Sequence, residues 1–177
     1  MMFVIAVIAL TSITVETTIG FTTSAFAGGG EQQQERFIAE LTGLEQVPPV
    51  NDTAAIGVAE FKVGQDSIMY RINVTDIENV TATHIHSGQV GENGPVVVTL
   101  FQEDTPTTTA AATTGVLLSE GNITATNLEG PMAGKPLSTL TSAMQNEQTY
   151  VNVHTQHNPD GEIRGQILDE ITEMVVE

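Results

Sequence analysis

The chain of 177 residues contains no cysteine and no tryptophan, and only 5 of its residues are Lys or Arg against 22 Asp or Glu. The absence of Cys excludes disulfide scaffolds, thiolate catalysis, Cys-based zinc sites and iron–sulfur clusters. Five basic residues cannot neutralise a row of phosphates, so the composition argues against nucleic-acid binding and against docking on an anionic membrane surface. The formal net charge of -17 leaves cations, basic proteins and neutral surfaces as partners.

Long apolar runs are also scarce, and the one at the amino terminus is short. Residues 2–10 are all apolar, which is too few to cross a bilayer, and Ala25-Phe26-Ala27 has the small-x-small pattern of a signal-peptide cleavage site. These features predict a signal peptide over residues 1–27, and therefore a secreted or cell-surface protein without a membrane span once the signal is cleaved. No Lys or Arg precedes the apolar run, so an uncleaved anchor is the alternative.

The rest of the chain divides by composition into three parts. Residues 28–36 are rich in Gly, Gln and Glu and predict a flexible stem. Residues 37–168 are long enough for one domain with a sizeable core. Residues 169–177 are expected to form a tail that either caps this core or pairs with the sheet edge of another subunit.

Four Asn-x-Ser/Thr sequons occur in the chain, and in an exported protein they are candidate glycosylation sites. Because the sequence is rich in Thr, chance matches are the alternative. The asparagines are Asn51, Asn73, Asn79 and Asn122.

Apolar and polar residues alternate with period two through most of the domain, while stripes of period 3.6 are nearly absent. One helix of about two turns is expected at Ser138–Gln145, and a Thr/Ala-rich loop at Gln102–Thr114. About eight short strands predict an all-β protein, an antiparallel sandwich or flattened barrel of immunoglobulin-like kind. The expected strands are Phe37–Leu44, Ala55–Val63, Ser67–Val74, Val80–His86, Val96–Phe101, Val116–Ala125, Tyr150–Thr155 and Glu162–Leu168.

All four histidines fall in two short motifs, THIHSG at residues 83–88 and NVHTQHNP at residues 152–159. Residues two apart on a strand share a face with Cα atoms roughly 6.5 Å apart, so His84 and His86 can converge on one ion. His154 adds a third ligand if its strand lies beside the first, and His157 is a weaker candidate. Neutral imidazole suits copper and zinc. The alternative is structural, with the histidines donating to loop carbonyls and orienting a turn without any metal.

Three polar residues near His154 are candidates to support such a site. Asn152 shares a strand face with His154, while Glu162 and Arg164 follow the next turn and are expected to face back across the hairpin. Asn152 or Glu162 would orient the ligand rings. For Arg164 we expect an ion pair with Glu162 or with an acid on a neighbouring strand. Steering of an anion toward a metal is the alternative.

Three ordered motifs resemble the CHRD domain, a family named for chordin and found alone in many exported microbial proteins. They are FIAELTGLEQVPPV at residues 37–50, HIHSGQVGENGP at residues 84–95 and YVNVHTQHNPDGEIRGQ at residues 150–166. The resemblance runs from about Phe37 to Ile167. It implies an extracellular domain with an immunoglobulin-like sandwich and no established activity.

A fainter similarity is to copper/zinc superoxide dismutase, itself a β-sandwich. In that family a His-x-His pair on one strand and a Val-His on a late strand ligate copper, and His84, His86 and Val153-His154 occur here in the same order. The chain has no counterpart of the histidine that bridges copper and zinc, no zinc-binding loop and no disulfide. The similarity therefore implies at most a single mononuclear site of three histidines.

Two functions follow as expectations. The favoured one is a non-enzymatic exported module that binds an unknown extracellular protein or cell-surface component, or assembles with itself through sheet edges. The second is a mononuclear copper or zinc protein that stores the ion, delivers it or performs superoxide chemistry. A hydrolase using His154 with Asp160 or Glu162 is a weaker third, because the sequence has no G-x-S-x-G element or other activated serine.

Overall fold

The computed structural model describes residues 34–103, 109–113 and 115–170. The predicted signal peptide, most of the predicted stem and residues 171–177 of the predicted tail lie outside the described residues. Within the described part of the chain, no helix is long and apolar enough to cross a membrane.

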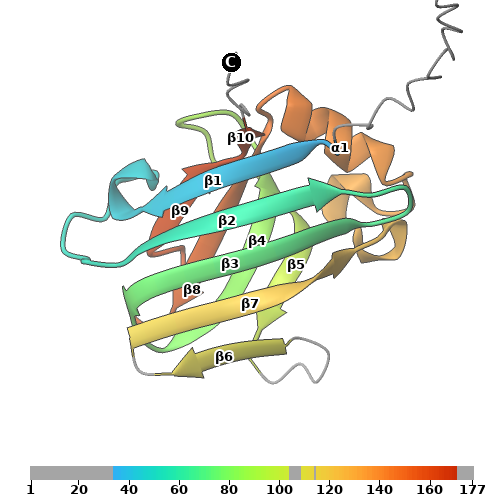
Figure 1. Ribbon diagram of the computed structural model, residues 1–177. Helices are drawn as coiled ribbons and strands as arrows, with labels where there is room; N and C mark the ends of the chain where they lie inside the picture. Colours follow the sequence, from blue (N-terminus) through green and yellow to red (C-terminus); the bar gives the residue numbers. More distant parts are fainter. Residues whose placement is uncertain (1–33, 104–108, 114, 171–177) are drawn as a thin grey trace, which may run out of the picture. The chain divides into compact units, whose positions relative to one another are not determined.

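The domain is built on one antiparallel sheet of ten strands, with the order β5-β4-β8-β9-β1-β2-β3-β7-β6 and with β10 paired to β1. The sheet folds over so that β1, β2, β3 and β7 lie in front of β9, β8, β4 and β5 (Figure 1). The predicted all-β antiparallel class is thus confirmed. The strands are β1 Arg36–Thr42, β2 Ile56–Val63, β3 Ile68–Ile77, β4 Val80–Ser87, β5 Val96–Gln102, β6 Thr109–Thr113, β7 Gly115–Ile123, β8 Thr149–Thr155, β9 Ile163–Gln166 and β10 Leu168–Asp169.

Helical structure is limited to one α-helix, α1 (Ser138–Gln145), and three single turns of 3-10 helix among the described residues. The predicted bounds of the helix are confirmed. Leu140 and Met144, four apart on one face, are buried, and Gln145 Nε2 donates to Glu35 Oε1 over 2.6 Å. The 3-10 turns are Gly43–Glu45, Ala125–Asn127 and Gly130–Met132.

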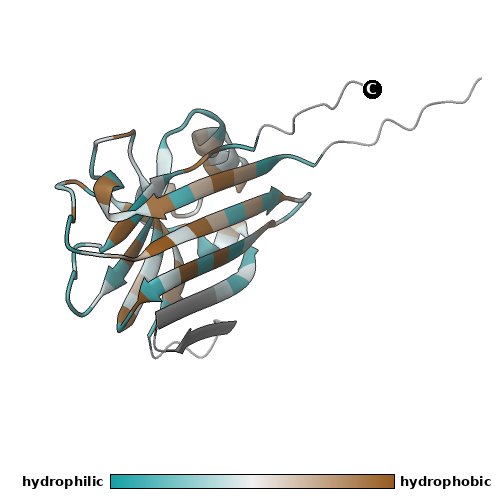
Figure 2. Ribbon diagram, turned by 60° about the vertical axis from the view of Figure 1, so that its left-hand side comes forward, coloured by the Kyte–Doolittle hydropathy of each residue, from teal (hydrophilic) through white to brown (hydrophobic). Residues whose placement is uncertain are grey.

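Strand β3 shows why these residues form a half-buried sheet. Its inward residues Ile68, Ile72 and Val74 are completely buried, while Met69 and Arg71 between them are exposed. Figure 2 shows the resulting alternation of hydrophobic and hydrophilic residues along β1, β2 and β3. Burying each large aliphatic side chain stabilises the fold by about 1.5–3 kcal/mol, so the period-two pattern selects the face that turns to the core.

Tight turns join two pairs of neighbouring strands. Gly64 N–H donates to Ser67 O over 2.8 Å where β2 turns into β3, and Gly161 N–H donates to Asn158 O over 3.0 Å between β8 and β9. The second turn contains Pro159.

Two predictions at the sheet margins are wrong. Residues 109–113 of the predicted Thr/Ala-rich loop form strand β6, which pairs with β7 from Thr109↔Glu120 to Thr113↔Val116. The segment TAAAT has no large apolar residue, so the sequence shows no alternation of apolar and polar residues there. Its strand conformation comes from pairing with β7. Likewise Asp169, assigned to the tail, belongs to β10 and pairs with Phe37; the sheet continues to this point because β1 offers an open edge beyond β9.

Candidate metal centre

Strands β4 and β8 are neighbours in the sheet, which brings the two histidine motifs together. The register places Ala82 opposite His154 and His84 opposite Asn152. One ligand nitrogen from each of His84, His86 and His154 lies within 4.8 Å of the others. The ring centroids are 4.9 to 5.8 Å apart. The three histidines predicted from the sequence as metal ligands therefore lie with their imidazoles around one point, placed there by β4 and β8.

Backbone carbonyls define the tautomers of two of these rings. His86 Nδ1 lies 2.8 Å from Gly94 O, and His154 Nδ1 lies 2.9 Å from Pro159 O. Since a carbonyl oxygen only accepts, both Nδ1 atoms carry the proton, which leaves both Nε2 atoms with a free lone pair. His86 and His154 thus donate to loop carbonyls, which is the structural role that the sequence suggested. The same bonds leave their Nε2 atoms able to bind a metal ion.

The Nε2 atoms of His154 and His86 differ in their partners. His154 Nε2 lies 3.1 Å from His84 Nδ1, so a neutral His84 donates to His154 when no ion is present. His86 Nε2 is buried and has no hydrogen-bond partner among the described residues. An ion at this cluster could take Nε2 of His86 and of His154 directly, and Nδ1 of His84 once the His84 proton has moved to the other ring nitrogen.

The surroundings of the cluster keep all three rings neutral near pH 7. Burial, together with the positive charge that His154 and His86 would carry, lowers the pKa of His84 to about 4. Burial also lowers the pKa of His86, against the opposing bond to Gly94 O. It lowers the pKa of His154 against the bond to Pro159 O and the nearby Asp160 charge. Neutral imidazole is the form that binds a metal ion.

Asn152 supports the loop that holds His154. Its Oδ1 accepts from Gln46 Nε2 over 2.5 Å, and its Nδ2 donates to Asp160 O over 3.2 Å. Asp160 follows Pro159, so Asn152 acts on the carbonyl rather than on the ring. Gln46 did not emerge from the sequence because it lies 106 residues away; its place in the EQVPPV motif is the only signal.

Within the described part of the chain, Arg164 does not form the ion pair predicted for it. Arg164 is 2% exposed, and its guanidinium donates to Gln89 O over 3.0 Å, Glu92 O over 2.9 Å and Asn93 Oδ1 over 3.2 Å. Its Cζ lies 3.5 Å from the centre of the Tyr150 ring. The guanidinium therefore binds oxygen atoms of the loop at residues 89–93 and not the carboxylate that we expected.

Glu162 does not face His154 as predicted. Its carboxylate accepts from Thr53 Oγ1 over 2.6 Å and from Thr155 Oγ1 over 2.8 Å. Among the described side chains, neither Glu162 nor Asp160 forms a hydrogen bond with His154, whose Nδ1 is already bonded to Pro159 O. The acid–histidine pair required by the hydrolase hypothesis is therefore missing from the described residues.

Tyr150 is a component of the site for which the sequence suggested no role. Its ring stacks on His86 with centroids 5.0 Å apart and an interplanar angle of 10°. Its hydroxyl accepts from Gly94 N–H over 3.1 Å. The only signal in the sequence was its spacing from Asn152 and His154.

The fourth histidine and the sequons lie outside this cluster. His157 is exposed and lines a separate hollow of about 310 Å³ together with Pro48 and Pro159. The four sequon asparagines are all exposed, as a glycan would require. They are Asn51, Asn73, Asn79 and Asn122.

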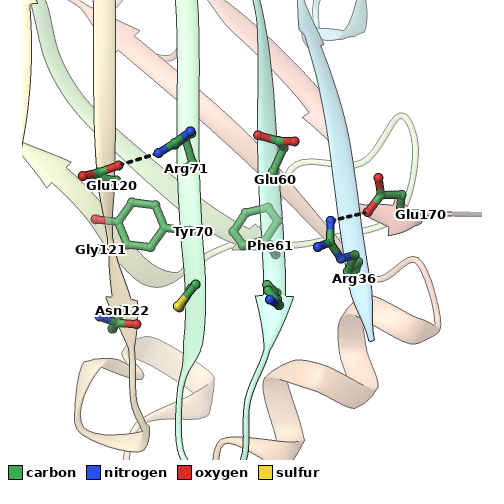
Figure 3. Close-up of a pocket in the computed structure, with 11 residues that line it drawn as sticks. Arg36, Glu60, Phe61, Tyr70, Arg71, Glu120, Gly121, Asn122 and Glu170 are labelled. Carbon is green, nitrogen blue, oxygen red and sulfur yellow. Dashed lines mark hydrogen bonds and ion pairs between the residues drawn. The ribbon is translucent and has the colours of Figure 1, made fainter. Parts of the chain in front are cut away.

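A larger hollow of about 520 Å³ lies on the outer face of β1, β2, β3 and β7. Figure 3 shows its charged side chains, among them the ion pairs Arg71–Glu120 at 3.2 Å and Arg36–Glu170 at 3.6 Å. None of the clustered histidines lines it.

Comparison with known proteins identifies the family. No curated protein matches the chain, and no solved structure does, so the similarity to superoxide dismutase rests on the order of the histidines alone. A family model described as the CHRD domain matches residues 37–167, which include β2 to β9, nearly all of β1 and both histidine motifs. The chain therefore belongs to the CHRD domain family.

Proposed function

We propose that this protein is an exported CHRD-domain protein that binds one copper or zinc ion through His84, His86 and His154. The observation that carries the proposal is the convergence of three ligand nitrogens from two strands within 4.8 Å. The pair His84 Nδ1 and His154 Nε2, 3.1 Å apart, is close to the separation of about 3.4 Å expected for two ligands with 2.0–2.1 Å bonds in a tetrahedral site.

The cost of leaving the site empty also supports a bound ion. An unsatisfied buried polar atom costs about 1–3 kcal/mol, and His86 Nε2 is such an atom. A metal ion would satisfy it and would replace the contact between His84 and His154 with two coordinate bonds. The low pKa values of the three rings mean that no proton has to be displaced from His⁺ at neutral pH.

Copper ranks ahead of zinc for this donor set. An all-imidazole site suits both ions, and Cu²⁺ binds a given nitrogen site more tightly than Zn²⁺. Three protein ligands leave one coordination position open, as in sites that exchange or deliver a ligand rather than purely structural ones.

Capture or delivery of the ion is favoured over superoxide chemistry. A net charge of -17 attracts cations and repels an anionic substrate. Arg164, the base nearest the histidine motifs in sequence, is 2% exposed and directed at Tyr150 and the loop carbonyls, so it does not steer an anion from solvent.

A metal titration tests the proposal. The purified full chain is stripped with EDTA and titrated with Cu²⁺ and with Zn²⁺, followed by calorimetry and melting temperature. Wild type is expected to bind one ion per chain and to melt higher by an amount that grows with free metal, and a His84→Gln/His154→Gln variant is expected to lose both effects. His157→Gln, which changes an exposed histidine on the same hairpin, is the matched control. Equal binding by wild type and the double variant would refute the site.

We also propose a second role, as an extracellular binding module that contacts a protein or a cell-surface component. It is supported by the outer face of β2, where Ile56 and Val58 lie two residues apart on the same face of the strand and are 57% and 36% exposed. Single exposed apolar residues are ordinary, and neighbouring ones are the feature expected of a contact surface. A double substitution of Ile56 and Val58 to Ser that leaves cell-surface binding and oligomeric state unchanged would remove this role without affecting the metal proposal.

A further inference from the structure

We infer that Tyr150 and Arg164 are positioning residues for the metal ligand His86, acting through the loop of residues 88–95. This inference rests on the proposed function, since it assigns how one ligand of that site is oriented. The evidence is a connected set of contacts among the His86 ring, the backbone of Gly94 and the side chains of Tyr150 and Arg164.

The first part of the set involves Gly94 and Tyr150. Gly94 O accepts the His86 Nδ1 proton over 2.8 Å, while Gly94 N–H donates to the Tyr150 hydroxyl over 3.1 Å. The Tyr150 ring then stacks on His86 with an interplanar angle of 10°. Tyr150 therefore restrains His86 twice, directly through the stack and indirectly through the residue whose carbonyl sets its tautomer.

The second part is the attachment of the loop to Arg164. Three donor bonds, to Gln89 O, Glu92 O and Asn93 Oδ1, join the guanidinium to the loop. Its planar fork directs these bonds in a fixed geometry, which an ammonium group does not reproduce. Its position 3.5 Å over the Tyr150 ring also fixes that ring by cation–π attraction.

Position 94 has room only for a glycine, because the loop packs closely against Ser87. A Cβ at this position would collide with the carbonyl oxygen of Ser87. Ser87 N–H in turn donates to Pro95 O over 3.0 Å, and Gly88 N–H donates to Gln148 O over 2.9 Å. One end of the loop is thus tied to β4 and the other to Gln148, which precedes β8, and Gly94 lies between these two attachments.

The role predicted for these residues is to hold the Nδ1–H tautomer of His86 and aim Nε2 at the ion. Groups that orient a ligand histidine in this way typically change metal affinity by about 10–100-fold when removed. A purely structural role would lower stability without changing the tautomer.

Nitrogen NMR of the histidine side chains and zinc calorimetry together test the assignment. Tyr150→Phe keeps the stack and removes the acceptor for Gly94 N–H, and Arg164→Lys keeps a cation and removes the fork. In EDTA-treated wild type at pH 7.5, His86 is expected as the pure Nδ1–H tautomer. In both variants we expect a mixture of tautomers, and at least a tenfold weaker zinc affinity.

Tyr70→Phe is the matched control. Tyr70 is the other tyrosine of the chain, is also buried, and its hydroxyl donates to Leu100 O over 2.7 Å. It should lower the melting temperature and leave the His86 tautomer and the zinc affinity unchanged.

Failure of this inference is distinguishable from failure of the proposed function. If wild type binds no ion, the metal proposal fails, and the tautomer measurement still decides whether Tyr150 and Arg164 set the His86 ring. If Tyr150→Phe folds and keeps both the pure Nδ1–H tautomer and the wild-type zinc affinity, the positioning role is overturned. Should Arg164→Lys not fold, Tyr150→Phe alone provides the decision.

Discussion

The four histidines differ in what surrounds them. His86 is buried and His84 and His154 are half-buried, and the three rings lie beside one another. His157, on the following turn, is exposed. Burial disfavours the charged form of an imidazole, so proximity and desolvation act in the same direction on the cluster. The chemistry available at these positions therefore depends on the packing of β4 against β8 and not on the residue type alone.

This difference predicts a pH dependence of stability in the metal-free protein. The unfolded chain protonates its histidines near pH 6.5, whereas the pKa of His84 in the folded state is about 4. Between these values the unfolded state binds more protons, so the free energy of unfolding is highest above about pH 6.5 and falls as the pH drops toward 4. Urea unfolding of wild type and His84→Gln, both with EDTA, measures this effect.

The difference in stability between wild type and His84→Gln reports the titration of the histidine, because both proteins contain the same carboxylates. The stability of wild type relative to His84→Gln should be greatest at pH 7 and should decrease by pH 4.5. Parallel stability curves for the two proteins across this range would show that His84 titrates normally in the folded state.

At the scale of elements, the short strand β9 links the two layers of the domain. It pairs with β8 through four residues and with β1 through Thr42↔Arg164. A Cβ on Gly165 would collide with the carbonyl oxygen of Glu40 on β1. A glycine is therefore needed here for the close approach of two backbones.

Gly165→Ala is expected to destabilise the domain by about 3 kcal/mol, the upper part of the range for overpacking. Gly91→Ala is the control, since Gly91 has a φ of 80° in the loop beside the site but no atom within 4 Å of the added Cβ. Its cost should be about 1 kcal/mol, from the left-handed backbone alone. Chemical denaturation measures both, and an equal cost would contradict the role assigned to the contact between β9 and β1.

The strand β6, which has no large apolar residue, was not predicted from the sequence. β3 was predicted because its apolar residues alternate, and β6 was not because Thr and Ala give no contrast between faces. The edge strand β6 is held by backbone hydrogen bonds to its neighbour β7. Such strands depend on the tertiary structure more than on their own sequence.

At the scale of the whole molecule, the acid excess is the dominant feature. The chain carries a formal charge of -17, and the ion pairs among the described residues are Arg36–Glu170 and Arg71–Glu120. Both pairs are exposed, and such pairs contribute about 0–1 kcal/mol each. Unpaired acids therefore repel one another in the folded state.

Salt should stabilise the protein by screening this repulsion. Raising NaCl from about 10 to 150 mM shortens the screening length from roughly 30 to 8 Å. Relief of about 1 kcal/mol would raise the melting temperature by roughly 3 °C in a domain of this size. Scanning fluorimetry with EDTA present measures the change.

The effect of salt should shrink at pH 4.5, close to the isoelectric point of about 4.2, because there the net charge is small. A melting temperature that does not respond to salt at pH 7.5 would mean that the acids are too far apart to interact.

Local sequence patterns were enough to predict the all-β class, most of the strands and the three histidines as candidate ligands, because period-two alternation and His-x-His spacing are local properties. The pairing of β4 with β8, the binding of Arg164 to loop carbonyls instead of Glu162, and the contact of Gln46 with Asn152 from 106 residues away depend on the folded chain. These contacts join segments distant in the chain. Their partners are selected by the folding of the sheet, and no spacing along the sequence encodes which carbonyl a buried donor will meet.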